Sequence, residues 1–131
     1  MRRFALIVAL MLVASPAFAG PYLFELLEIK AYRAGWNAMF KGEKNIPSWL
    51  TNFNKTMDGV STPSEDIEID GQPYVYSNVC KPHDCGDNMV HVVFSVYDGS
   101  AFGLIADANG KRLLGKPDAA IADALKGKAG Q

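Results

Sequence analysis

The spacing of apolar residues predicts a helix near the start of the chain. Over residues 29–40, apolar side chains recur every three or four positions and would share about a third of the helix circumference. They are Ile29, Tyr32, Trp36, Met39 and Phe40. The preceding leucines extend the pattern back to about Tyr22, and Gly42 is a suitable C-cap. We interpret this stripe as a helix face packed on a sheet; a partner-binding helix is the alternative.

Two further helical segments are shorter. Residues 47–53 begin with a proline and fit one or two helical turns, whereas residues 54–66 have the composition of a loop. Near the C-terminus, Pro117 and Asp118 are typical of a helix start, and fraying is expected after about Lys126. The apolar positions of this last helix are Ala120, Ile121, Ala124 and Leu125.

Between the helices, the apolar period changes to two, which is typical of β-strands. Strands are predicted around residues 67–69, 74–80, 89–97, 101–106 and 111–114, with turn dipeptides such as Asp70-Gly71 and Asn109-Gly110 between them. In the clearest strand, the core face should carry Val90, Val92, Phe94 and Val96, with His91 facing away and assigned no role. Short connections favour antiparallel pairing. The predicted fold is α+β: an antiparallel sheet of about five strands, with an N-terminal amphipathic helix and a short C-terminal helix packed on it.

The first 19 residues have the three-part pattern of a secretory signal peptide. Arg2 and Arg3 precede eleven consecutive apolar residues, and Ala17-Phe18-Ala19 is a small-x-small cleavage site. A transmembrane anchor is the alternative, but the apolar run is shorter than the ~20 residues that span a bilayer. We therefore expect export, cleavage after Ala19, one domain over residues 20–131 and no membrane association of the mature form.

Composition excludes several classes of protein. The chain has 131 residues, which fits a single domain, and its 49% of hydrophobic residues argues against disorder. The formal net charge is −1, and loss of Arg2 and Arg3 with the leader would make it −3. Without a run of basic residues, a nucleic-acid partner is not expected.

The two cysteines enclose the most informative segment, CKPHDC at residues 80–85. Four intervening residues do not fit a thioredoxin-type pair, which has two. A zinc site could use Cys80, Cys85, His83 and perhaps His91, but the spacing is unusual for structural zinc, so no metal is expected. In an exported chain, an even number of cysteines favours one disulfide.

A disulfide would make this loop a small, stiff and protruding ring. Closing it is worth about 2 kcal/mol by chain entropy. Pro82 fixes its own φ and restricts Lys81 to extended conformations, so His83 would be presented in nearly one pose. Two interpretations stay open on chemistry alone: a binding loop that presents His83, or an ordinary closed turn with an exposed histidine.

CKPHDC resembles the signature of the Ivy family, the inhibitors of vertebrate lysozyme. The flanking segments YVYSNV and MVHVVFS resemble the family's strands, and WNAMFKGEKNIPSWL at residues 36–50 resembles its helix and following stretch. The resemblance covers about residues 36–110. Beyond the fourth strand this chain looks shorter than the best-known members, which leaves homodimer formation open.

The resemblance implies a periplasmic inhibitor of c-type lysozyme without cofactor or enzymatic activity. Its loop would enter the lysozyme cleft, with His83 at the two catalytic carboxylates, flanked by Lys81, Pro82 and Asp84 and held by a Cys80–Cys85 disulfide. The alternative target is the bacterium's own lytic transglycosylase. An enzyme using His83 and Asp84, a metal-binding export protein and a purely structural module are the other hypotheses. Trp36 and Trp49 are expected in or near the core rather than on a sugar-binding surface.

Overall fold

The structure, a computed structural model, describes residues 18–131. Most of the expected signal peptide therefore lies outside the described residues. The elements in chain order are α1 (Leu23–Leu26), α2 (Lys30–Met39), α3 (Ser48–Thr56), β1 (Glu65–Ile69), β2 (Gln72–Cys80), β3 (Asn88–Ser95), β4 (Ala101–Asp107), β5 (Gly110–Leu114) and α4 (Ala119–Ala129). No helix among residues 18–131 is long and apolar enough to cross a bilayer.

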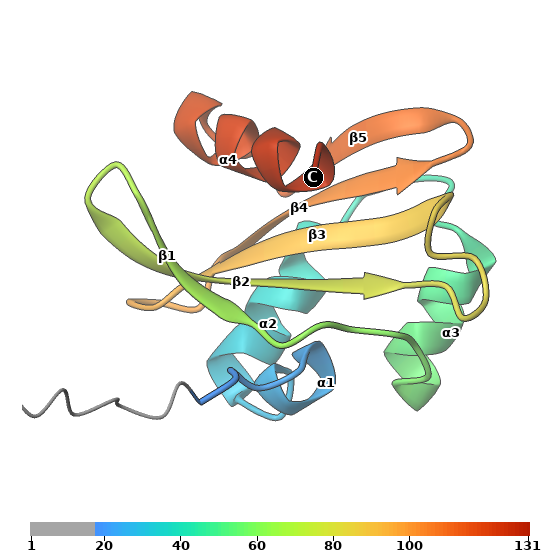
Figure 1. Cartoon of the computed structure of the whole chain (residues 1–131), viewed down its shortest axis with the longest axis horizontal. Helices are drawn as coiled ribbons and strands as arrows, with labels where there is room; N and C mark the ends of the chain where they lie inside the picture. The colour runs from blue at the N-terminus through green and yellow to red at the C-terminus, as the bar shows by residue number, and fades with distance from the viewer. Residues whose placement is uncertain (1–17) are drawn as a thin grey trace, which may run out of the picture.

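The five strands form one antiparallel sheet in the order β1-β2-β3-β4-β5. Each strand therefore pairs with its neighbour in sequence, as the short turns predict. Asp70 and Gly71 both have positive φ in the β1–β2 turn, as such tight hairpin turns require. The α+β prediction with five strands is confirmed (Figure 1).

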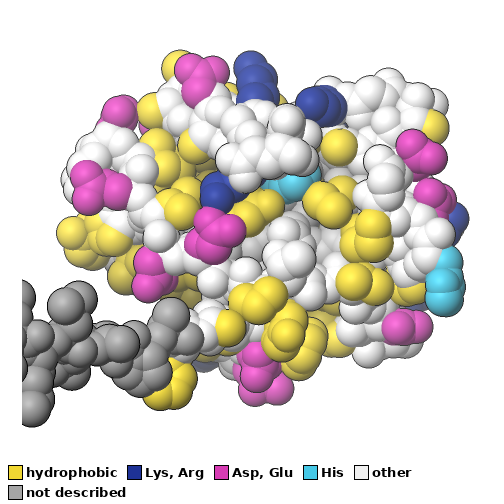
Figure 2. All heavy atoms as spheres, in the orientation of Figure 1, with side chains coloured by type: hydrophobic (Ala, Val, Ile, Leu, Met, Phe, Trp, Pro, Cys, Tyr) yellow, Lys and Arg dark blue, Asp and Glu magenta, His cyan; other side chains and the backbone are white. Residues whose placement is uncertain are grey.

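One face of the sheet is covered by α1, α2 and α3 (Figure 1). Trp36 is fully buried there, and its indole Nε1 donates to Asn54 Oδ1 of α3 at 2.6 Å. Trp49 packs against the same core, so both tryptophans lie where the sequence analysis expected them. Figure 2 shows hydrophobic side chains exposed over α1, where the rings of Tyr22 and Phe24 stack with centroids 5.7 Å apart.

The other face of the sheet is covered by α4 (Figure 1). Ile121 and Leu125 of that helix pack on Val93 and Leu104. The central strand β3 is consequently buried on both faces, whereas the sequence analysis placed only one face in the core. The prediction that Val96 belongs to this core is wrong. The strand β3 ends at Ser95, and Val96 is 49% exposed in the β3–β4 turn.

Three predicted helix boundaries need correction. The single helix expected from Tyr22 onward is broken between α1 and α2, because Ile29 is extended and Arg33 Nε donates to the free carbonyl of Leu27 at 3.0 Å. The short helix after Pro47 continues to Thr56, into the predicted loop. The last helix continues past Lys126 to Ala129, and Lys128 in its last turn pairs with Glu65 of β1.

Candidate functional site

The CKPHDC segment forms the connection between β2 and β3. Cys80 is the last residue of β2 and is buried. It forms a disulfide with Cys85, with the two Cα atoms 4.9 Å apart, so the predicted pairing is confirmed. The disulfide joins the end of β2, the strand next to the edge strand β1, to a half-exposed residue of the loop. The intervening residues are thereby closed into a ring at one end of the sheet.

Within this ring the backbone makes a tight turn. The amide of Asp84 donates to the carbonyl of Lys81 at 3.0 Å. The two central residues are Pro82 and His83, and His83 has φ +64°. Proline followed by a residue with positive φ is the arrangement of a type II turn, whose third position usually favours glycine. Histidine is therefore held in a backbone conformation that it would not adopt by preference.

Asp84 stabilises the loop from inside. Its carboxylate accepts a hydrogen bond from Asn88 Nδ2 at 2.8 Å and lies 3.5 Å from Lys81 Nζ. The backbones of Lys81 and Asn88 are also bonded, and the amide of Asn88 donates to the carbonyl of Asp84. The hydrogen bonds of Asp84 therefore hold the loop closed, and none of them goes to the imidazole of His83.

The base of the loop is fixed by a distant segment. Val60, in the connection from α3 to β1, exchanges two backbone hydrogen bonds with Cys80, at 2.8 and 3.1 Å. These bonds cover the outer side of the last β2 residue beyond the end of β1. The ring therefore begins at a strand end that pairs with Val60 on one side and with β3 on the other.

The ring leaves the side chain of His83 exposed and without a hydrogen bond among the described residues. Lys81 and His83 are exposed, and Pro82 and Asp84 are half-exposed. Within residues 18–131 the imidazole of His83 makes no hydrogen bond, so both of its nitrogens are open to a partner. The predicted site residues are all brought together by the turn, but the lysine and aspartate pair with each other.

The comparisons with known proteins give the same family that the sequence of the loop resembles. The family model described as "Inhibitor of vertebrate lysozyme (Ivy)" matches residues 31–129. The chain belongs to the Ivy family. This match reaches into α4, beyond the stretch of about 36–110 on which the resemblance rested.

Three curated relatives of this Ivy chain illustrate the match. A Pseudomonas aeruginosa protein named "Inhibitor of vertebrate lysozyme" is 48% identical over 84 residues, which are 64% of this chain and 52% of that protein. An uncharacterized Yersinia pestis protein is 40% identical over 83 residues, 63% of this chain and 51% of that protein. The Escherichia coli K12 protein named "Inhibitor of vertebrate lysozyme" is 28% identical over 106 residues, 79% of this chain and 64% of that protein. The chain spans between about half and two thirds of the length of these relatives.

The second histidine of this Ivy chain lies away from the loop. His91 points away from the Val90 and Val92 face as expected, but it is buried, and its Nδ1 lies 2.8 Å from the Tyr76 hydroxyl. Burial, with the positive charges of Lys111 and Lys128, lowers the pKa of His91, and burial raises the pKa of Tyr76. His91 therefore does not join the cysteines in a zinc set, and among residues 18–131 no three His, Cys, Asp or Glu side chains cluster as a metal site.

Two residues that shape the Ivy loop escaped the sequence analysis. Asn88 holds the Asp84 carboxylate, and Val60 binds the end of β2. The four-residue spacing from Asp84 to Asn88 is a weak signal that could have been noticed. For Val60 the sequence offers none, because Val60 lies in the predicted loop of residues 54–66 and its partner Cys80 is 20 residues away.

Proposed function

We propose that this chain inhibits c-type lysozyme by placing the residue 80–85 loop in the enzyme's active-site cleft, with His83 at its tip. Membership of the Ivy family supports an inhibitor. The observation that carries the mechanism is a disulfide-closed turn, held by internal hydrogen bonds, that leaves one imidazole uncommitted. Because the backbone of the loop is already ordered, binding would mainly cost the ~0.5–1.5 kcal/mol usually lost for immobilising a side chain such as that of His83.

The chemistry of an imidazole fits the catalytic pair of a retaining glycosidase. Lysozyme places a protonated glutamic acid and an ionised aspartate with their carboxyl groups about 5 Å apart. A neutral imidazole has one donor and one acceptor nitrogen. His83 would donate to the aspartate and accept from the glutamic acid, so both catalytic groups would be occupied and the sugar subsite blocked.

A binding role also fits the loop better than catalysis by its own residues. Both cysteines are in the disulfide, so neither offers a thiolate nucleophile. The Asp84 carboxylate is directed to Asn88 and Lys81, so it does not orient His83 as a catalytic base would require. We therefore propose an inhibitor rather than an enzyme.

The proposed place of action is the periplasm. Residues 1–19 have the pattern of a cleavable signal peptide. The Cys80–Cys85 disulfide suits an oxidising compartment outside the cytoplasm. A lysozyme inhibitor in that compartment would lie beside the peptidoglycan that lysozyme attacks.

The first experiment is a lysozyme titration on peptidoglycan with the oxidised mature protein, His83→Ala and Asp70→Ala. Asp70 is an exposed turn residue with φ +49° at the opposite end of β2, so it controls for placing alanine in a left-handed turn. We expect His83→Ala to weaken binding by at least about 2 kcal/mol, roughly 30-fold, as for a buried interface hot spot. Asp70→Ala should inhibit like the wild type.

Two results would contradict this proposal. Equal inhibition by wild type and His83→Ala would remove His83 from the mechanism. Absence of inhibition by the folded, oxidised wild type would remove c-type lysozyme as the target. The same titration against bacterial lytic transglycosylases, which also hold a catalytic acid in a glycan cleft, then tests the alternative target.

A further inference from the structure

The loop alone is too small for a stable protein–protein complex. A typical interface buries about 800 Å² and about 20–30 residues on each partner. Between Cys80 and Cys85 there are four residues, and only Lys81 and His83 are exposed. An inhibitor that binds through this loop therefore needs further contacts from segments at the same end of the molecule.

Two such segments lie beside the loop. Asn88, where β3 begins, pairs with Asp107, the last residue of β4. The β4–β5 turn at residues 108–109 therefore leaves the sheet next to the loop. The start of α3 also reaches this end of the sheet, which is at the right in Figure 1. Loop, turn and helix start thus share one end of the molecule.

A hollow of about 330 Å³ lies between these three segments. Its walls include Lys81 and Asn88 from the loop, Ser48 and Trp49 from α3, and Ala108 and Asn109 from the turn. The lining side chains carry hydroxyl, amide and ammonium groups and the carboxylate of Asp107, together with the indole of Trp49. A hollow of this size and polarity can receive a polar side chain from a docked protein.

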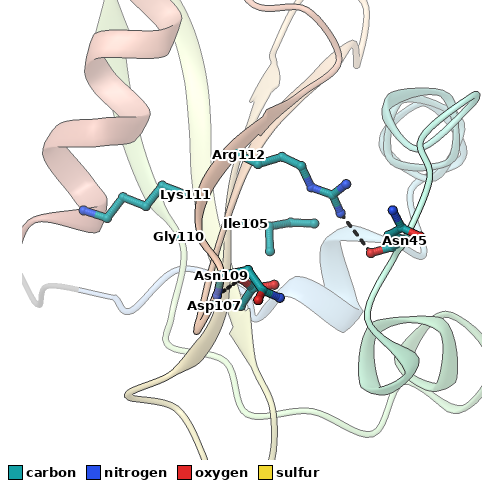
Figure 3. A pocket seen from close by; sticks show the side chains of 7 residues that line it. All are labelled: Asn45, Ile105, Asp107, Asn109, Gly110, Lys111 and Arg112. Atoms are coloured by element: carbon teal, nitrogen blue, oxygen red, sulfur yellow. Dashed lines mark hydrogen bonds between the residues drawn. The ribbon is translucent and has the colours of Figure 1, made fainter.

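The walls of this hollow are held by the rest of the fold. The amide of Asn109 donates to the carboxylate of Asp107 at 2.8 Å, which fixes the turn. Arg112 of β5 donates to the carbonyls of Lys44 and Asn45 at 2.7 and 3.2 Å. The bond from Arg112 to Asn45, drawn in Figure 3, joins two walls of a second hollow of about 310 Å³. The two hollows share Asn45, Asp107 and Asn109. The surface is therefore ordered before any partner binds.

We infer that the lysozyme-binding surface continues from the loop across this hollow. Ser48, Trp49, Ala108 and Asn109 form what we call the end surface. The inference rests on the proposed function, because it assigns further contacts to the same complex. With His83 inside the cleft, the end surface contacts the rim of the cleft, and a polar side chain of that rim enters the hollow.

The test uses a matched pair of tryptophan variants. Ala108→Trp places a large ring at the hollow, whereas Ala119→Trp places the same ring at an exposed position at the start of α4. Ala119 is a suitable control because β5 runs away from the end surface before α4 begins. We expect the inhibition constant for lysozyme to rise at least tenfold in Ala108→Trp and to stay unchanged in Ala119→Trp, with unchanged melting temperatures for both.

Hydrogen exchange of the unmodified protein gives a second measurement that needs no substitution. Lysozyme binding should slow exchange of the amides of residues 81–88 and of 107–110. The β3–β4 turn at residues 96–99, at the other end of these strands, should exchange as in the free protein.

The outcomes separate the two proposals. The inference of the end surface is overturned if Ala108→Trp inhibits lysozyme as well as the wild type does. It is also overturned if both tryptophan variants lose inhibition equally. Exchange protection confined to residues 81–88 overturns it as well. If His83→Ala loses inhibition in any of these cases, the loop mechanism stands without the end surface. If His83→Ala inhibits like the wild type, the proposed function fails and the end surface fails with it.

Discussion

At the residue scale, Ser77 is an unfavourable side chain in the core. It lies in β2 between Val75 and Val79, is fully buried, and its hydroxyl has no hydrogen-bonding partner among the described residues. A buried hydroxyl without a partner costs about 1–3 kcal/mol. Alanine removes this cost and leaves only a small void, so Ser77→Ala should raise the free energy of unfolding by about 1 kcal/mol.

Urea denaturation of wild type, Ser77→Ala and Asn78→Ala measures this effect. Asn78 is a suitable comparison because it faces the other way and donates to Thr62 Oγ1 at 2.8 Å and to the Tyr76 hydroxyl at 3.3 Å. Removing this satisfied amide should destabilise the fold. If Ser77→Ala also destabilises it, the hydroxyl has a partner that the structure does not show.

The loop residues show what could be predicted at this scale. The disulfide and its four enclosed residues follow from the sequence, because two cysteines behind a predicted signal peptide favour a single disulfide. The left-handed backbone of His83 does not, since histidine is not the residue that a type II turn favours at that position. The pairing of Lys81 with Asp84 was also missed, because charged loop residues usually face solvent.

At the scale of elements, α2 and the β3–β4 turn approach each other through glycines. A Cβ on Gly35 would collide with the backbone carbonyl of Gly99, and a Cβ on Gly99 would come within 2.7 Å of the Ala31 carbonyl. The helix can therefore lie close to the turn only if both positions lack a side chain. This contact fixes where α2 sits along the sheet.

Alanine substitutions at two helical glycines should consequently act in opposite directions. In an open helix position, Gly→Ala stabilises by up to about 1 kcal/mol. Gly127 in α4 has open space around it, so Gly127→Ala should stabilise the protein. Gly35→Ala should destabilise it by about 1–3 kcal/mol, because backbone must move to admit the methyl group. Thermal unfolding of the two variants checks the contrast, and equal stabilisation would show that α2 adjusts freely.

Element boundaries differed in how well the sequence predicted them. The hairpins were predicted well because dipeptides such as Asp70-Gly71 mark tight turns. The break between α1 and α2 was missed because the apolar spacing continues through it. At this break the Arg33 side chain donates to the carbonyl of Leu27, six residues earlier, and apolar spacing does not report such a side-chain contact.

At the scale of the whole molecule, helices cover both faces of the sheet. The sequence predicted helices at both ends of the chain and strands between, which is enough for the α+β class. It did not predict that α4 takes the face opposite α2, because either face of the sheet offers apolar residues. One consequence is that His91, assigned no role, becomes buried beneath the last helix.

Burial of His91 should make folding stability depend on pH. Burial, with Lys111 and Lys128, lowers the pKa of His91 in the folded protein below its ordinary value of about 6.5. Below pH 6.5 the unfolded chain then binds a proton that the folded protein does not, so stability falls with falling pH, by at most about 1.4 kcal/mol per unit. The loss ends once the folded protein also binds the proton.

Denaturation between pH 8 and 5 should show a shallower decline of the free energy of unfolding in His91→Gln than in wild type. Tyr76→Phe removes the hydroxyl beside Nδ1 but leaves the histidine buried, so it should keep the wild-type slope. An unchanged slope in His91→Gln would assign the pH dependence to other groups.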